Sequence, residues 1–316
     1  MTKKTLHKQD LCGPFRIVRF AYRGRTTETF EALHDADGYE AAVTILTEEA
    51  GEDERETWRF QAETELFGEL DHRNILQLRG SGEREDLPWR AMEVAAAGSL
   101  RLRLHPGRGP LKSAVALCFL RQIADAIEVL HVAGLVHGEI APECFLLSDI
   151  DEVKLASLGG APLVRRGEPK RAGPPRFEAR RYGAPELLRG GAPNELTDVY
   201  SVGAIMREML EGPFATQAPR WMPQFLRRII EKAMNWHPAA RYSSMAALSQ
   251  ALNEAWSELL CTVRRNDEMA ETMTSLSTVF HQELARGEGG DVAAEMDQLE
   301  TLLNDLAQAV NSSEDG

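Results

Sequence analysis

Long hydrophobic runs are missing from this sequence of 316 residues. No stretch approaches the roughly 18 consecutive apolar residues that a membrane-spanning helix needs. The first ten residues, Met1 to Asp10, are charged and lack the apolar segment that follows the charged start of a secretory signal. These two absences predict a cytoplasmic protein without a membrane span.

Cysteine is scarce as well. The four cysteines lie far apart, with no Cys-x-x-Cys pair and no histidine cluster at zinc spacing, and they are Cys12, Cys118, Cys144 and Cys261. This pattern argues against a disulfide framework and against a structural metal site. We therefore interpret each cysteine as a small buried hydrophobic residue.

The sequence also lacks an excess of positive charge, because 36 basic residues face 49 acidic ones and the net charge is −13. Such a balance argues against general binding to nucleic acid or to anionic membranes. The acidity is uneven, since residues 257–316 hold 13 acidic residues and 3 arginines. The C-terminal extension carries most of the net negative charge.

Two kinds of hydrophobic pattern divide the rest of the chain. Alternating runs predict strands at 15–20, 29–33, 39–46, 75–79 and 89–94, with Asp37-Gly38 as a hairpin turn. Helical spacing predicts helices at 58–70, 114–133 and 197–210. This order indicates an α+β protein with a small antiparallel β lobe, including one helix, ahead of a larger helical lobe.

A segment rich in glycine, proline and arginine interrupts the helical part at 159–181. Its composition disfavours both helix and strand, so we expect a long basic loop. The loop is either solvated or a contact site for an acidic partner. One such partner would be the acidic C-terminal tail, of the same chain or of a second chain, in an association sensitive to salt. The candidate contact residues are Arg165, Arg166, Arg171, Arg176, Arg180 and Arg181.

Two amphipathic stripes lie beyond about residue 266, separated by Gly287-Glu-Gly-Gly290. The second stripe includes Met296, Leu299, Leu303 and Leu306. Each stripe covers about two heptads, fewer than the ~3–4 that indicate a coiled coil. The spacing predicts a helical hairpin, which either packs on the main domain or joins two molecules.

Several landmarks follow one another in a recognisable order. They are His72-Arg-Asn-Ile75, Met92-Glu93, Leu135-Val-His-Gly-Glu-Ile-Ala-Pro-Glu-Cys-Phe-Leu-Leu147, Val153-Lys-Leu-Ala-Ser-Leu-Gly159, Tyr182-Gly-Ala-Pro-Glu186, Asp198-Val-Tyr-Ser-Val-Gly203 and Arg241. Together they make residues 12–256 resemble a protein kinase of the bacterial Ser/Thr type. The resemblance implies a two-lobed protein-kinase-like fold, in which 1–11 is an N-terminal segment and 257–316 an acidic helical extension. The N-lobe would be 12–94 and the C-lobe 95–256, with an activation-type loop at 157–186 and a shortened region after 212.

The positions that the resemblance assigns to ATP phosphates depart from the family pattern. Where the family has a glycine-rich loop, this chain has Tyr22, Gly24 and Thr27 at the three glycine positions. The lysine of the third strand is replaced by Thr44. Its helix partner corresponds to Glu63, which we therefore expect to be a solvated helix residue without a cation.

The positions assigned to catalysis depart as well. His137-Gly138-Glu139 stands in place of His-Arg-Asp, and a base displaced by about an ångström can lower a rate ~100-fold. Gly138 also stands where the family has the arginine through which many kinases sense phosphorylation of the activation loop. The two magnesium ligands of the family correspond to Cys144 and Ser157, although magnesium prefers carboxylate oxygens. The resemblance therefore implies a frame without the usual catalytic groups.

Positions with structural roles in the family still match. The resemblance assigns His137, Phe67, Leu78 and Leu158 to an apolar stack between the lobes, Asp198 to a brace of the catalytic loop, and Glu186 with Arg241 to a buried ion pair. The positions that would line a nucleotide pocket are Gly24, Ala42, Met92 and Leu146. Thr29 replaces the valine that the family places over the purine, which makes this pocket a poorer fit.

A sequence that keeps the frame and lacks the chemistry is typical of a pseudokinase. We expect a protein-binding scaffold or regulatory module with no cofactor and no metal, which binds protein partners or self-associates through the C-terminal helices. The alternative is an atypical or weakly active Ser/Thr kinase that uses ATP and magnesium. It would use Glu139 as its base and a relocated basic residue, such as Arg23 or Arg25, in place of the lysine.

Overall fold

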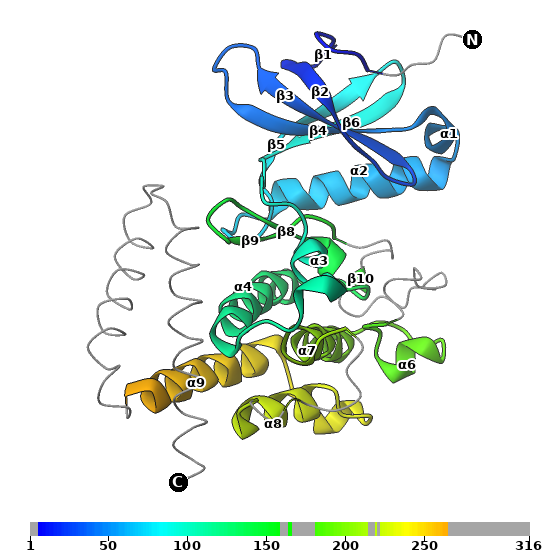
Figure 1. The fold of residues 1–316 in the computed structure, drawn as a ribbon. Coiled ribbons are helices and arrows are strands. Elements are labelled where there is room, and N and C mark those ends of the chain that lie inside the picture. Colours follow the sequence, from blue (N-terminus) through cyan, green and yellow to red (C-terminus); the bar gives the residue numbers. More distant parts are fainter. Residues whose placement is uncertain (1–5, 159–163, 166–180, 214–218, 220–221, 265–316) are drawn as a thin grey trace. The chain divides into compact units, whose positions relative to one another are not determined.

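The computed structural model describes residues 6–158, 164–165, 181–213, 219 and 222–264. The chain divides into two compact units. The first comprises Met1–Ala96 with Lys154–Leu158, and the second comprises Ala97–Val153 with Gly159–Gly316. Figure 1 shows the first unit as mainly sheet and the second as mainly helix.

The first unit contains a six-stranded antiparallel sheet. Its strands are β1 (Leu11–Cys12), β2 (Phe15–Arg23), β3 (Thr27–His34), β4 (Glu40–Leu46), β5 (Leu78–Arg84) and β6 (Leu87–Met92), in the spatial order β1-β2-β3-β4-β6-β5. Buried and more exposed residues alternate along the first half of β2 and along most of β3 and β4, so one face of these stretches is buried. That face forms a core around Phe15, Phe30, Val43 and Trp89.

The outer half of β2 lies at the edge of this sheet. Strand β1 pairs only with Phe15 and Arg16, and in the described part of the chain no strand pairs with the remainder of β2 on that side. The pairing of β2 with β3 is irregular at two places, between Ile17 and Arg19 and between Phe20 and Tyr22. The exposed Arg19 forms an ion pair with Glu31 of β3, with 2.6 Å between Nε and Oε2. The edge is therefore bulged and charged.

Two helices follow β4. They are α1 (Glu48–Gly51) and α2 (Glu54–Glu69), and the Asp53 side chain caps α2 by accepting a hydrogen bond from the backbone N–H of Arg55 at 2.9 Å. Helix α2 buries Phe60, Thr64 and Phe67, which recur at helical spacing and share one face. This face contacts β5 and β6 (Figure 1).

The second unit is built on long helices. They are α4 (Ser113–Val132), α7 (Glu195–Glu211), α8 (Gln224–Ala233) and α9 (Met245–Arg264), with the short helices α3 (Leu100–Arg103) and α6 (Pro185–Leu188). Short elements complete it: η1 (Pro106–Arg108), β7 (Leu135–Val136), η2 (Pro142–Cys144), β8 (Phe145–Leu147), β10 (Val164–Arg165) and η3 (Pro238–Ala240). Strand β9 (Val153–Leu155) contains the point where the chain passes to the first unit.

Helix α7 is the centre of the second unit. It is buried along most of its length and contacts α4, α8 and α9. Asn194 and Thr197 form a capping box at its start, so its first N–H groups are paired where they enter the core. This start holds the polar network described below.

The structure corrects several expectations. The strand expected at 75–79 is β5, which starts at Leu78, and Ile75 forms only an isolated bridge to Leu155. The segment 159–181 was expected to contain no strand, yet β10 pairs with β7, because Val164 and Arg165 lie between the glycines and prolines and each carries a backbone N–H and C=O. All four cysteines were expected to be buried, but Cys261 is exposed and Cys118 is half-buried. Cys12 is buried as expected, and its burial raises the pKa of its thiol to about 12. The C-terminal hairpin lies outside the described residues.

Among the described helices, none is long and apolar enough to cross a bilayer.

Candidate functional site

In the first unit, Glu63 of α2 is paired with a cation. Its Oε2 lies 2.9 Å from Nη1 of Arg90, which belongs to β6, and both side chains are largely buried. The expectation of a solvated, cation-free Glu63 is therefore wrong. The sequence contains a signal for this pair, because Arg90 is the one charged residue of Leu87–Met92, a fully buried strand, and a buried charge needs a partner.

Thr44 and Arg90 are directly opposite residues of neighbouring strands. Strands β4 and β6 pair antiparallel with Thr44 aligned to Arg90, so the two side chains lie on the same face of the sheet. The Thr44 hydroxyl is hydrogen-bonded to the hydroxyl of Thr29 at 3.0 Å. The cation that is absent from β4 is thus present one strand away.

The arginines expected to replace the lysine have other partners. Arg23 pairs with Glu28 at 3.0 Å, and Arg25 pairs with Glu56 at 3.2 Å. Between them Gly24 closes the β2–β3 hairpin, donating its N–H to the carbonyl of Thr27 at 2.8 Å. The loop that resembles a phosphate-binding loop is therefore a short tight turn, and Tyr22 at its start is exposed.

Glu63 also binds the segment that resembles the magnesium loop. Its Oε1 accepts a hydrogen bond from the backbone N–H of Leu158 at 2.8 Å and a longer one from Ser157 Oγ at 3.4 Å. Leu158 and Phe67 are fully buried, whereas Leu78 is only half-buried. Ser157 offers a hydroxyl where a metal-binding carboxylate is expected.

The segment that resembles the hinge is held by Glu93. Its backbone N–H donates to the carbonyl of Gln77 at 2.9 Å, and its carboxylate lies 3.1 Å from Nζ of Lys154. Of the expected pocket residues, Ala42 is aligned with Met92 across β4 and β6, and Met92 is buried. Leu146 belongs to the second unit, where it bridges to Ser99.

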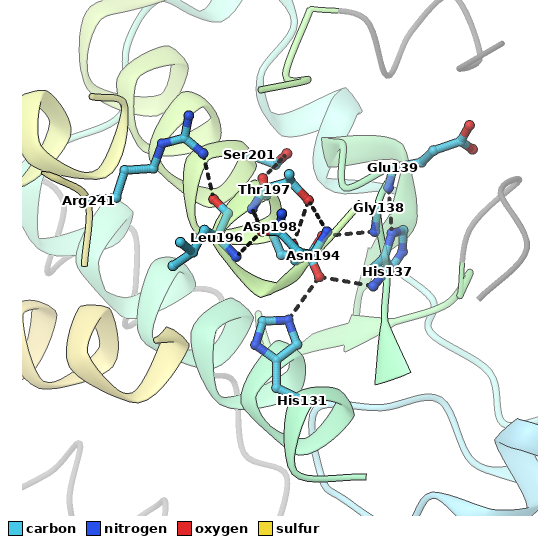
Figure 2. A network of polar contacts seen from close by, with 10 residues as sticks. All are labelled: His131, His137, Gly138, Glu139, Asn194, Leu196, Thr197, Asp198, Ser201 and Arg241. Carbon is cyan, nitrogen blue, oxygen red and sulfur yellow. Dashed lines mark hydrogen bonds and ion pairs between the residues drawn. The ribbon is translucent and has the colours of Figure 1, made fainter. Parts of the chain in front are cut away.

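In the second unit, the Asp198 carboxylate accepts three hydrogen bonds (Figure 2). The carboxylate is fully buried, and its Oδ2 lies 2.9 Å from the backbone nitrogen of His137 and 2.9 Å from Nε2 of His131. Its Oδ1 accepts from the backbone N–H of Gly138 at 2.8 Å. Asp198 thus braces the loop that resembles the catalytic loop, which is the role that the family resemblance implies for it.

In the same loop, a thiol stands at one position where the family has a metal-binding side chain. Cys144, where an asparagine is expected, directs its Sγ to the carbonyl oxygen of Glu139 at 3.5 Å. Gly138 has a φ of +74°, a left-handed conformation that favours glycine. Figure 2 shows the Glu139 side chain pointing away from the Asp198 network.

The expected ion pair between Glu186 and Arg241 is present. The Arg241 guanidinium, whose side chain is 0% exposed, contacts the two Glu186 oxygens at 2.7 and 2.8 Å. It also donates to the carbonyls of Asn235 at 2.8 Å and Leu196 at 2.9 Å. The pKa of Glu186 is lowered, because its hydrogen bonds to Arg241 outweigh the opposing effect of burial.

A second buried acid, Glu208 of α7, was not found from the sequence. Its Oε1 lies 2.8 Å from Nη1 of Arg101, and its Oε2 accepts from the Tyr182 hydroxyl. Nε of Arg101 also binds Glu143 at 2.8 Å. These residues are far apart in sequence, so no local pattern brings them together. Burial opposes ionisation of Glu208, but the hydrogen bonds from Arg101 and Tyr182 outweigh it and lower its pKa.

The lowered pKa of Glu208 predicts acid-sensitive stability. A carboxylate whose folded pKa lies below the ordinary value of 4.5 stabilises the fold above that pH, and this contribution is lost as the pH falls through the folded value. We expect Glu208→Gln to destabilise the protein at neutral pH and to differ less from the wild type as the pH falls below 4.5. Urea unfolding at several pH values measures this difference, and a difference that grows on acidification would contradict the assignment.

Most expected partner-binding residues lie outside the described residues. This holds for Arg166, Arg171, Arg176, Arg180, Met296, Leu299, Leu303 and Leu306, and for the side chain of Arg165. Arg181 is described, and its Nη1 lies 3.6 Å from Oε1 of Glu208 in the same unit.

The comparisons with known proteins agree with this architecture. The protein kinase domain family matches residues 22–270, which is more than half of the chain, so the chain belongs to the protein kinase domain family. The solved kinase domain of Mycobacterium tuberculosis PknI is 22% identical, with a TM-score of 0.60 over 79% of this chain and 99% of that domain. The expected protein kinase fold, with an antiparallel sheet and a helical part, is confirmed.

Curated relatives are bacterial serine/threonine-protein kinases. PrkC of Bacillus subtilis is 25% identical over 305 residues, which cover 88% of this chain and 46% of PrkC. PknL of Mycobacterium tuberculosis is 28% identical over 279 residues, which cover 82% of this chain and 69% of PknL. The chain thus spans about half the length of PrkC.

Proposed function

We propose that this chain is a pseudokinase, a cytoplasmic scaffold or regulatory module that binds proteins and does not transfer phosphoryl groups efficiently. The observation that carries the proposal is the set of contacts of Glu63. One of its oxygens binds Arg90 and the other binds the Leu158 N–H, so its cation comes from β6 and not from the β4 position, Thr44, where the family has its phosphate-binding lysine. The cation of this pair is buried and paired within the protein.

The second unit supports the same function. The Cys144 thiol donates to a backbone carbonyl within its own loop, and a thiol is a poor ligand for a hard cation such as magnesium. The Asp198 brace and the Glu186–Arg241 pair maintain the frame around this loop. The frame is thus retained while metal-binding residue types are replaced.

A second candidate function is weak protein kinase activity, with Glu139 as the base. The retained pair of Glu63 with a cation favours it, because this pair accompanies phosphoryl transfer in the family. Arg90 would take the role that the sequence had suggested for Arg23 or Arg25. ATP and magnesium would be the cofactors of this activity, and the serine/threonine-protein kinases among the relatives support it.

Nucleotide-dependent thermal unfolding separates the two functions. We expect the melting temperature to stay unchanged in millimolar ATP, with or without magnesium or manganese. A ligand at ~100 times its Kd would add about 2.7 kcal/mol to the free energy of unfolding, which is readily detected. A metal-dependent increase, together with radiolabel transfer from ATP that is lost in Glu139→Ala, would overturn the pseudokinase proposal.

In this proposal, protein partners bind to the acidic C-terminal extension or to the basic loop. We expect Leu299→Glu with Leu303→Glu to abolish self-association or capture of a partner, because the charges would interrupt the apolar stripe. Glu300→Gln, one residue away, is the matched control and should leave association intact. Sedimentation velocity of the full chain measures self-association, and unchanged association in the double variant would refute this assignment.

A further inference from the structure

The guanidinium of Arg90 packs against three side chains on one face of helix α2. Phe60, Glu63 and Phe67 recur at helical spacing on α2, so they point to the same side. The Arg90 Cζ lies 4.8 Å from the ring centroid of Phe60 and 5.3 Å from that of Phe67. Between these rings Nη1 reaches Glu63 at 2.9 Å.

This arrangement fixes the cation in place. Arg90 is 9% exposed and is attracted both by the aromatic rings and by the carboxylate. A buried ion pair of this kind holds its elements in one register, because separating the partners would leave an uncompensated charge in the core. Strand β6 and helix α2 are therefore joined by one side chain.

The same carboxylate connects a third segment. Glu63 Oε1 accepts from the Leu158 N–H at 2.8 Å, while Oε2 is used by Arg90. Helix α2, strand β6 and the start of the segment after β9 thus share one acid. Because all three belong to the first unit, the connection is complete within that unit.

From this geometry we infer that Arg90 is the positioning residue that anchors helix α2, and that it keeps the helix docked on the sheet when no nucleotide is bound. It acts through Glu63, with which it forms its ion pair. The inference deepens the proposed function and rests on it for its meaning, since a permanently docked helix suits a protein that binds rather than switches. The anchor itself is measurable independently of activity.

Hydrogen exchange of the full chain, read on peptides from Glu54–Glu69, tests the anchor. We expect these amides to be protected in the wild type and to change less than about twofold when ATP and magnesium are added. In Arg90→Met, exchange of α2 should rise about tenfold or more, because the apolar replacement keeps the bulk but leaves Glu63 without its cation. Peptides from α7 in the second unit should be unaffected.

Matched variants separate anchoring from simple packing. Arg19→Met removes an exposed ion pair on β2 and should leave α2 unchanged. Arg90→Lys, which keeps the charge, should retain part of the protection, and Thr44→Lys in the Arg90→Met background should restore it, because residues 44 and 90 are opposite one another. Should Arg90→Met fail to fold, Glu63→Gln and the restoring double variant provide the same comparison.

Three results would overturn the inference. They are an Arg90→Met variant that protects α2 as well as the wild type, a wild type whose α2 becomes protected only when ATP is added, and a Thr44→Lys change that restores nothing. Phosphoryl transfer by a chain with a protected α2 would refute the proposed function and leave the anchor intact. A chain that transfers no phosphoryl group and whose α2 amides exchange freely would refute the anchor and leave the proposed function intact.

Discussion

Replacing Arg241 by methionine should lower the free energy of unfolding by about 3–5 kcal/mol, because it removes one partner of a buried ion pair. The Glu186 carboxylate and the carbonyls of Asn235 and Leu196 would lose their shared donor. Methionine fills part of the space but supplies no hydrogen bond. Urea unfolding followed by circular dichroism measures the change.

The exposed pair of Arg19 and Glu31 gives the control for this result. Arg19→Met should change the free energy of unfolding by less than about 1 kcal/mol, because solvated ion pairs contribute little. A double variant with Glu186→Gln and Arg241→Met should be less destabilised than the sum of the two single variants. Equal small effects of Arg241→Met and Arg19→Met would show that the buried pair does not stabilise the second unit.

Replacing Asp198 by asparagine should lower the free energy of unfolding by about 3 kcal/mol, although the two side chains have nearly the same shape. The carboxylate accepts from Gly138 on one oxygen and from His137 and His131 on the other. An amide has only one acceptor oxygen, so its NH2 group would face at least one backbone N–H in either orientation. That N–H would stay buried and unpaired.

Asp125→Asn is the matched control for Asp198→Asn. Asp125 is exposed on α4 and accepts a long hydrogen bond of 3.3 Å from Ser249, so the substitution should change stability by less than about 0.5 kcal/mol. Hydrogen exchange should also increase in the His137–Gly138 segment of Asp198→Asn alone. Unchanged exchange there would contradict the role of Asp198 as a brace.

The sequence predicted the fold well where local patterns are strong. The start of β2 and the strands β3 and β4 were recognised because apolar residues alternate on a half-buried sheet, and α4 and α7 because their apolar faces are long. The start of β5 was misplaced, since Gly80 and Gly82 interrupt the alternation and the strand is largely exposed. Asp198, Glu186 and Arg241 were identified by the motifs that contain them.

The charged core of the first unit was missed for a different reason. Thr44 stands at the position where the family motif has the lysine that pairs with Glu63. Since the motif gives only the residue at that one position, Thr44 suggested that Glu63 has no cationic partner. The partner came from another strand, and only the pairing of β4 with β6 places Arg90 beside Thr44. Along the chain, the only sign of this compensation is an arginine within an otherwise uncharged strand, and the strand pairing is needed to identify its partner.

The bulged edge of β2 has a consequence for behaviour at high concentration. Phe20 and Tyr22 are exposed there, and an open strand carrying aromatic residues invites the backbone of another molecule to add to the sheet. Two irregularities bend this strand away from a flat template, and Arg19 and Arg23 surround the aromatic residues with charge. We therefore expect this edge to expose its aromatic side chains and yet to be a poor template for edge-to-edge addition of another copy.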